Sequence, residues 1–148
     1  MFRFIADLFR TPSLPQAPFV DPILGEFTFD SDLGWKRTVV IDNSDVEIVL
    51  GSDGEPPDAA MLQTARSWVQ TWPTQKSRMI DYARGEILNW VIEPNPPSAD
   101  DLIIQSINIL WPDDPETCMI YFQNPGDDIR LFHLTLNGLE PGGFAYDY

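Results

Sequence analysis

The sequence predicts an α+β domain in which one antiparallel sheet of about six strands carries two main helices on one face. Alternating apolar and polar residues, bounded by turn residues, recur both before and after the middle of the chain. The middle instead has apolar residues at helical spacing. The chain has 148 residues, of which 43% are hydrophobic, so one domain with a substantial core is expected.

The chain begins with a predicted short helix and linker, residues 1–18, ahead of a single domain over residues 19–148. Residues 2–9 have apolar side chains at i, i+3 and i+7, which form one stripe on a helix. Residues 11–18 contain three prolines, as is typical of an extended linker. The stripe has three candidate contacts: its own domain, a second copy of the chain in a homodimer, or a membrane surface.

Three strands follow in a predicted antiparallel meander. Alternation places them near residues 27–29, 35–41 and 46–50. Asp, Asn, Ser and Gly between the strands supply the turns.

The middle of the chain predicts two antiparallel helices joined at Pro73. Asp58 is positioned to cap the first helix and Thr74 the second, and Pro94 ends the pair. The apolar stripe of the first helix consists of Met61, Ala65, Trp68 and Trp72. That of the second helix consists of Ile80, Ala83, Ile87 and Trp90. We expect the core to centre on these tryptophans and isoleucines, packed on the sheet.

The last part of the chain returns to strands. Residues 98–101 have the spacing of a capping box with Asp at its last position, which predicts a short helical turn. Three strands follow at residues 105–111, 117–123 and 130–137. The order strand, strand, strand, helix, helix, strand, strand, strand gives the predicted fold class.

The charge of the chain restricts its partners. The net charge is -14, and residues 94–148 carry one basic and nine acidic groups. Such a chain is repelled by phosphate backbones and by anionic membranes, so we expect neither nucleic acid nor membrane as a partner. A basic protein would be attracted. With no signal peptide recognised and a single cysteine, we expect a cytoplasmic location.

The side chains that most often perform catalysis are scarce. Cys118 and His133 are the only cysteine and the only histidine, so neither a disulfide nor a site of several such ligands can form within the chain. Cys118 is predicted to be buried and His133 to lie on a strand surface, so a Cys–His pair is not expected. The sequence therefore predicts no catalytic residue, no metal site and no cofactor.

Paired acids are the remaining candidates for chemistry, and all of them fall in predicted turns. Asp favours turns because its side chain bonds its own backbone. Gathered in one pocket, the same carboxylates could instead serve a hydrolytic or metal-dependent enzyme. The pairs are Asp30/Asp32, Asp100/Asp101, Asp113/Asp114 and Asp127/Asp128.

Aromatic side chains near acidic turns predict a surface for a basic protein, because aromatic residues and charge complementarity are typical of binding hot spots. The predicted partner-binding residues are Asp113, Asp114, Tyr121, Asp127, Asp128 and Tyr146.

Residues 21–30, which begin with the sequence D-P-I-L-G, and Trp35 resemble the opening of the bacterial domain of unknown function 2262 family. Residues 132–139 are similar to the closing strand and loop of that family. The resemblance covers about residues 19–144. It implies no catalytic residues, and related small acidic α+β domains occur among the immunity proteins of bacterial toxin systems.

These observations lead us to expect a bacterial protein-binding module, namely an immunity protein that neutralises a toxin through an acidic surface containing aromatic residues. An enzyme that uses clustered Asp and an accessory domain that oligomerises through residues 2–9 are the alternatives. Asp residues gathered in one concave pocket would favour the enzyme. Asp residues around the rim of an aromatic patch would favour the binding module.

Overall fold

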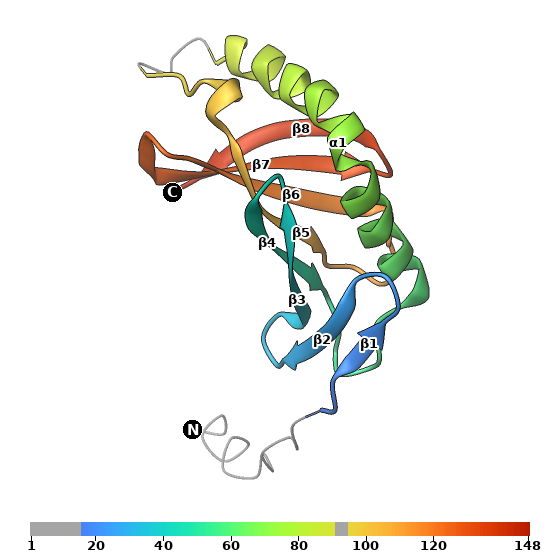
Figure 1. Cartoon of the computed structure of the whole chain (residues 1–148). Helices are drawn as coiled ribbons and strands as arrows, with labels where there is room; N and C mark the ends of the chain where they lie inside the picture. The colour runs from blue at the N-terminus through green and yellow to red at the C-terminus, as the bar shows by residue number, and fades with distance from the viewer. Residues whose placement is uncertain (1–15, 91–94) are drawn as a thin grey trace, which may run out of the picture.

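The computed structural model describes residues 16–90 and 95–148, and it shows one eight-stranded sheet with a long helix on one face (Figure 1). The helix, α1, spans Ala59–Leu88, and the 3-10 helix η2 spans Ala99–Asp101. The strands are β1 (Phe19–Asp21), β2 (Gly25–Asp30), β3 (Gly34–Ile41), β4 (Ser44–Leu50), β5 (Ile103–Ile109), β6 (Thr117–Asn124), β7 (Asp127–Asn137) and β8 (Glu140–Asp147).

The sheet is mixed, and its strands neighbour one another in chain order from β1 to β8. Every pair is antiparallel except β4 and β5, which are parallel. The predicted antiparallel sheet of about six strands under two main helices is therefore wrong. Two antiparallel helices would have returned the chain to the end of the sheet where β4 stops. A single long helix leaves the chain at the other end, so β5 runs parallel to β4.

The error in helix number arises at Pro73, where the sequence predicted a turn and the structure continues α1 without a break. A proline inside a helix costs about 3 kcal/mol. Trp72 and Met79 lie on either side of it, and both belong to the buried core. Burying two large apolar side chains contributes about 3–6 kcal/mol, which offsets that cost. Trp72, Met79 and Ala83 are spaced by seven and four residues, so the apolar stripe keeps its phase across the proline.

The two edge strands were missed, whereas the six predicted strands coincide with β2 to β7. The sequence does contain a signal for β8, which forms a hairpin with β7. Asn137-Gly138 is a typical hairpin-turn dipeptide, and Gly138 has a φ of 59°. Phe144 and Tyr146 alternate with Gly and Ala, as expected for a strand with one buried face.

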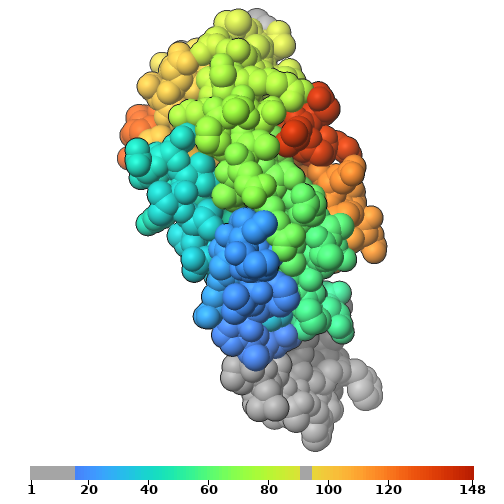
Figure 2. All heavy atoms as spheres, turned by 45° about the vertical axis from the view of Figure 1, so that its right-hand side comes forward, coloured from blue at the N-terminus to red at the C-terminus, as the bar shows by residue number. Residues whose placement is uncertain are grey.

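The core lies between α1 and the sheet, and Figure 2 shows the atoms of α1 running down the middle of the covered face. Trp68 and Trp72 are 0% and 1% exposed. Ile80 and Ile87 are also buried, which confirms four of the five predicted core residues. Trp90 is half-buried just after the helix, where its ring stacks on Phe144 at 5.7 Å.

The four basic side chains of α1 all form ion pairs with acids. Arg66 pairs with an acid of β1, and the others reach the β3–β4 turn, β8 and η2. The basic side chains of α1 thus tie the helix to acids on the strands, the turn and η2 around it. The pairs are Arg66–Asp21, Lys76–Asp42, Arg78–Glu140 and Arg84 with Asp81 and Asp100.

The helix start is confirmed, because the side chain of Asp58 accepts hydrogen bonds from the backbone N–H groups of Ala60 and Met61. Ser98 precedes η2 but makes no capping hydrogen bond through its side chain. The predicted helix over residues 2–9 lies outside the described residues. Within residues 16–90 and 95–148, no helix combines the length and the apolar character needed to cross a membrane.

Candidate functional site

No helix or strand among the described residues covers the face of the sheet opposite α1, and we call this the open face. Its side chains are those that alternate with the core residues of each strand. On β6, for example, Cys118, Ile120 and Phe122 are buried under the helix, whereas Met119 and Tyr121 point to the open face. The polar groups of the open face are therefore positioned by the same alternation that builds the core.

A hollow of about 580 Å³ lies on the open face. Its size is within the range of ligand-binding clefts. Two carboxylates line it, and no Lys or Arg of residues 16–90 and 95–148 does. The lining residues, which define the open-face hollow, are Glu47, Gln105, Ser106, Asn108, Tyr121, Leu131 and Asp147.

Cross-strand register places three polar side chains next to one another at this hollow. Tyr121 lies opposite His133, with their ring centroids 5.6 Å apart. Asp147 lies beyond His133, and its Oδ2 is 3.5 Å from the histidine Nε2. Burial and the negative charge of Asp147 raise the pKa of the Tyr121 hydroxyl. Tyr121 therefore remains neutral at physiological pH and can donate a hydrogen bond.

Several polar groups around the hollow have unused hydrogen-bonding capacity. Oδ1 of Asn108 and Nδ1 of His133 are buried and find no hydrogen-bond partner in the part of the chain that the structure describes. Gln105 donates its amide nitrogen to Gln123 at 2.6 Å, which leaves its own oxygen as an acceptor. Rotation of the Asn108 amide about its last torsion exchanges oxygen and nitrogen, so this residue too can offer an acceptor to the hollow.

An apolar row borders the hollow at one end of the sheet. Four large apolar side chains of the open face are well exposed there, at the end of β3 and at the beginnings of β5 and β7. Exposed polar side chains of the strands between them interrupt the row, because Asp45 of β4 lies opposite Val40 and Gln123 of β6 lies opposite Ile103. A mixture of exposed apolar and polar residues is typical of protein-binding surfaces. The row consists of Val40, Ile103, Ile129 and Leu131, which are 70%, 43%, 71% and 39% exposed.

The arrangement offers no nucleophile next to a base. Cys118 is fully buried on the helix side of the sheet, and burial raises the pKa of its thiol, whereas His133 lies on the open face. The predicted separation of these two residues is confirmed. Ser106 and His133 are separated by β6, so about 9–10 Å lies between their strands. Among the described residues, no group of three His, Cys, Asp or Glu could hold a metal ion.

The first two predicted binding residues lie in the turn between β5 and β6. Asp113 and Asp114 are both exposed. Asp114 accepts a hydrogen bond of 2.6 Å from the Thr117 hydroxyl through its side chain. The Asp114 side chain thus bonds a threonine side chain and not its own backbone, which the turn rule had predicted as its partner, while Asp113 is exposed.

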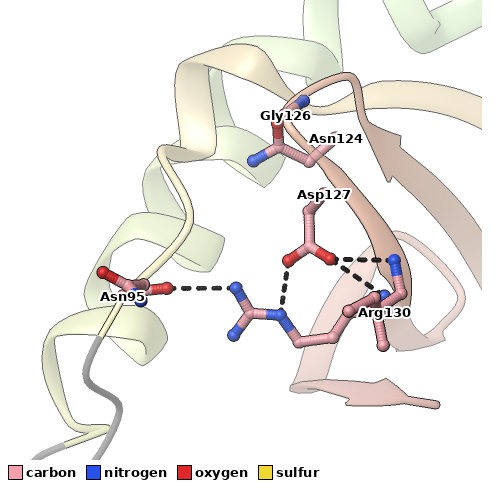
Figure 3. A network of polar contacts seen from close by, with 6 residues as sticks. Asn95, Asn124, Gly126, Asp127 and Arg130 are labelled. Atoms are coloured by element: carbon pink, nitrogen blue, oxygen red, sulfur yellow. Dashed lines mark hydrogen bonds and ion pairs between the residues drawn. The ribbon is translucent and has the colours of Figure 1, made fainter.

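Asp127 and Asp128 lie at the other end of β6, where they are the first two residues of β7. Asp127 is held inside a network, because its carboxylate accepts hydrogen bonds from Nε of Arg130 at 2.5 Å and from the backbone N–H of Ile129 and Arg130 (Figure 3). These bonds hold the pKa of the Asp127 carboxyl below its usual range, and the bond from the backbone N–H of Arg130 has the largest effect. Asp128 is exposed. The four predicted acids therefore do not form one patch.

Tyr146 lies on the helix side of the sheet, opposite to Tyr121. Its ring meets Trp90 edge-on at 5.2 Å and lies 5.1 Å from the Arg130 guanidinium carbon. The same guanidinium donates a hydrogen bond to the backbone oxygen of Asn95 (Figure 3). Of the six predicted residues, only Tyr121 lines the open-face hollow.

The D-P-I-L-G segment has a structural role. Asp21 is 1% exposed, and its Oδ1 accepts hydrogen bonds from the backbone N–H of Ile23 and Leu24 at 2.9 and 2.7 Å. Its carboxylate also pairs with Arg66 of α1. Gly25 follows with a φ of 93°, and a Cβ there would lie 3.1 Å from the guanidinium of Arg37. The segment fastens the first hairpin to the helix, so it needs no ligand to explain it.

Sequence reasoning missed most of the hollow. Glu47, Ser106 and Asn108 sit at the polar positions of strands that were predicted, but only their register across β4 and β5 shows that they are neighbours. Asp147 was missed because β8 was not predicted. The available signal was the alternation itself, which assigns all four residues to the side facing away from the core.

Comparison with protein-family models, with curated proteins and with solved structures finds no match to this chain.

Proposed function

We propose that the chain is a protein-binding module that binds a basic partner protein through the open face of its sheet. The observation that carries this proposal is the pairing of an acidic, polar hollow with an exposed apolar row on the one sheet face that α1 leaves uncovered. An interface of this kind combines apolar contact area with polar groups that fix the orientation of the partner.

Charge supports a basic partner. The net charge of the chain is -14, and Glu47 and Asp147 face the hollow. In the described strands, Lys36 is the only Lys or Arg on the open face; it pairs with Asp30 at 3.1 Å and also interacts electrostatically with Glu47. Its positive charge is thus compensated locally, and the open face keeps a negative potential that attracts cations.

The biological setting that we propose is bacterial and cytoplasmic, with the chain acting as an immunity protein that neutralises a toxin. The size, the acidity and the lack of a nucleophile–base pair in the described residues are compatible with this role. The resemblance to the domain of unknown function 2262 family supports the same class of protein. Finding a toxin gene directly upstream in the source genome would give independent support for this role at the least effort.

Surface plasmon resonance tests the proposed function with a partner captured from source cells and then purified. Leu131→Ser removes apolar contact area without adding a charge and is expected to weaken binding at least tenfold, because burying a leucine side chain contributes about 1.5–3 kcal/mol. Leu33→Ser is the matched control, since Leu33 is 48% exposed in the β2–β3 turn, away from this face. Equal binding by both variants would place the interface elsewhere.

Salt dependence tests the role of the charge separately. Electrostatic attraction is screened over about 8 Å at physiological ionic strength, so the association rate should fall as salt rises while the dissociation rate changes less. Glu47→Gln with Asp147→Asn should slow association, and Asp113→Asn with Asp128→Asn should slow it less. An association rate that responds to neither salt nor the first pair would show that the acidic residues serve solubility alone.

A further inference from the structure

The open-face hollow is richer in hydrogen-bond acceptors than in donors. Carboxylates stand at both sides, Glu47 on β4 and Asp147 on β8, and the amide oxygen of Gln105 is free to accept. In the part of the chain that the structure describes, no Lys or Arg lines the hollow. A group that fills it favourably must therefore carry positive charge and several donors.

The aromatic floor of the hollow is the ring of Tyr121, and His133 stands next to it without lining the hollow. The rings of Tyr121 and His133 lie 5.6 Å apart with an angle of 44° between their planes. Asp147 stands at the edge of this floor, since its carboxylate is 3.5 Å from Nε2 of the histidine. A planar cation can stack on the Tyr121 ring and reach the carboxylate at the same time, because the two are separated by only one side chain.

We propose that this hollow holds an arginine side chain of the partner protein, stacked on Tyr121 and paired with Asp147; this inference rests on the proposed function. A guanidinium is flat, weakly hydrated and carries five donors, so it can stack and bond to acceptors in its plane together. A lysine ammonium is a strongly hydrated point charge and uses an aromatic wall less well. The acceptor-rich walls and the aromatic floor thus favour arginine over lysine.

The apolar row explains how one arginine could contribute strongly. Leu131 lines the hollow and belongs to the row, so apolar surface of the partner that covers Leu131 and Ile129 also excludes water from the arginine site. Hot-spot residues are typically surrounded by contacts that keep water out. The arginine is therefore expected near the centre of the interface.

The test uses the full chain labelled with ¹⁵N and three small probes: blocked arginine amide, blocked lysine amide and blocked citrulline amide. Citrulline keeps the shape of arginine but lacks its charge. The arginine probe should shift the backbone signals of Ser106, Tyr121, His133 and Asp147 in a saturable manner. Lysine should bind at least threefold more weakly, and citrulline should leave these signals unchanged.

Variants of the hollow sharpen the test. Asp147→Asn and Tyr121→Leu should each weaken the arginine probe about threefold to fivefold, whereas Asp113→Asn, the same charge change outside the hollow, should have no effect. Both hollow residues point away from the core, and Glu47→Gln serves as a third variant if either changes the spectrum of the free protein. Signal shifts spread over the whole acidic surface, or equal shifts with the citrulline probe, would overturn the inference. So would an arginine affinity that none of the three variants changes.

Failure of the arginine site can be told apart from failure of the proposed function. If the arginine probe does not bind the hollow but Leu131→Ser still weakens binding of the purified partner, the open face remains the interface and only the arginine assignment is wrong. If Leu131→Ser leaves partner binding unchanged, the proposed function itself has failed.

Discussion

Replacing Asp21 by alanine removes a carboxylate that joins the first hairpin to the helix. Its side chain is 0% exposed, it accepts two backbone hydrogen bonds of 2.9 and 2.7 Å, and it pairs with Arg66, which is 23% exposed. Each hydrogen bond to a charged acceptor contributes about 1.5–3 kcal/mol. Some of that is regained when water reaches the N–H of exposed Ile23. We expect Asp21→Ala to lower the free energy of unfolding by about 3–4 kcal/mol.

The conservative variant separates the two roles of the carboxylate. Asp21→Asn keeps an oxygen for the backbone N–H groups of Ile23 and Leu24 but loses the charge that faces Arg66. It should therefore cost only about 1–2 kcal/mol. Asp113→Ala is the control, because that side chain is exposed, and its effect should stay within about 0.5 kcal/mol.

Urea denaturation followed by tryptophan fluorescence measures these differences, since buried tryptophans of α1 report on the packing of the helix. The dependence of the unfolding free energy on urea concentration should stay constant, while the urea concentration at the midpoint decreases. A loss below about 1 kcal/mol for Asp21→Ala, or equal losses for the alanine and asparagine variants, would refute the role assigned to this residue.

Three further predictions concern acidity, the proline and the tyrosine of the hollow. The hydrogen bond from Arg66 lowers the pKa of Asp21, and Lys76 lowers that of Asp42. The ionised carboxylates therefore stabilise the fold above the unfolded-state pKa of about 3.9, and this stabilisation is lost as pH falls through their lower folded-state pKa values. The urea midpoint should therefore decrease at pH values below about 4. Pro73→Ala should raise the thermal midpoint, since it restores a helix bond inside α1; a lower midpoint would indicate a built-in turn. The ultraviolet titration of Tyr121 should move to lower pH in the Asp147→Asn protein, and an unchanged curve would contradict their coupling.

Local patterns predicted the elements better than their assembly. Alternation located β2 to β7, and Asp58 located the start of α1, because each depends on residues close in sequence. The single helix could not be predicted from a proline rule alone, because the packing of Trp72 and Met79 against the sheet outweighs the local cost of Pro73. The parallel pairing of β4 and β5 was missed because of that one error.

The candidate site depended on register, which sequence reasoning did not supply. Tyr121 was predicted as a partner-binding residue for its aromatic character, and it lines the hollow beside neighbours that were not predicted. His133 and Asp147 meet it only through the pairing of β6 with β7 and of β7 with β8. Asp127 looked like a surface acid, yet Arg130 and the backbone occupy its carboxylate.

The order of the strands has a consequence for how this chain folds. Seven pairings build the sheet, and six of them join strands that are consecutive and linked by short turns, so each half can form as a local meander. The pairing of β4 with β5 instead closes a loop over residues 51–102. Closing a long loop costs entropy before any contact compensates for it. This topology therefore favours a folding order in which the two meanders form first. The pairing of β4 with β5 forms last, once α1 has packed against both meanders.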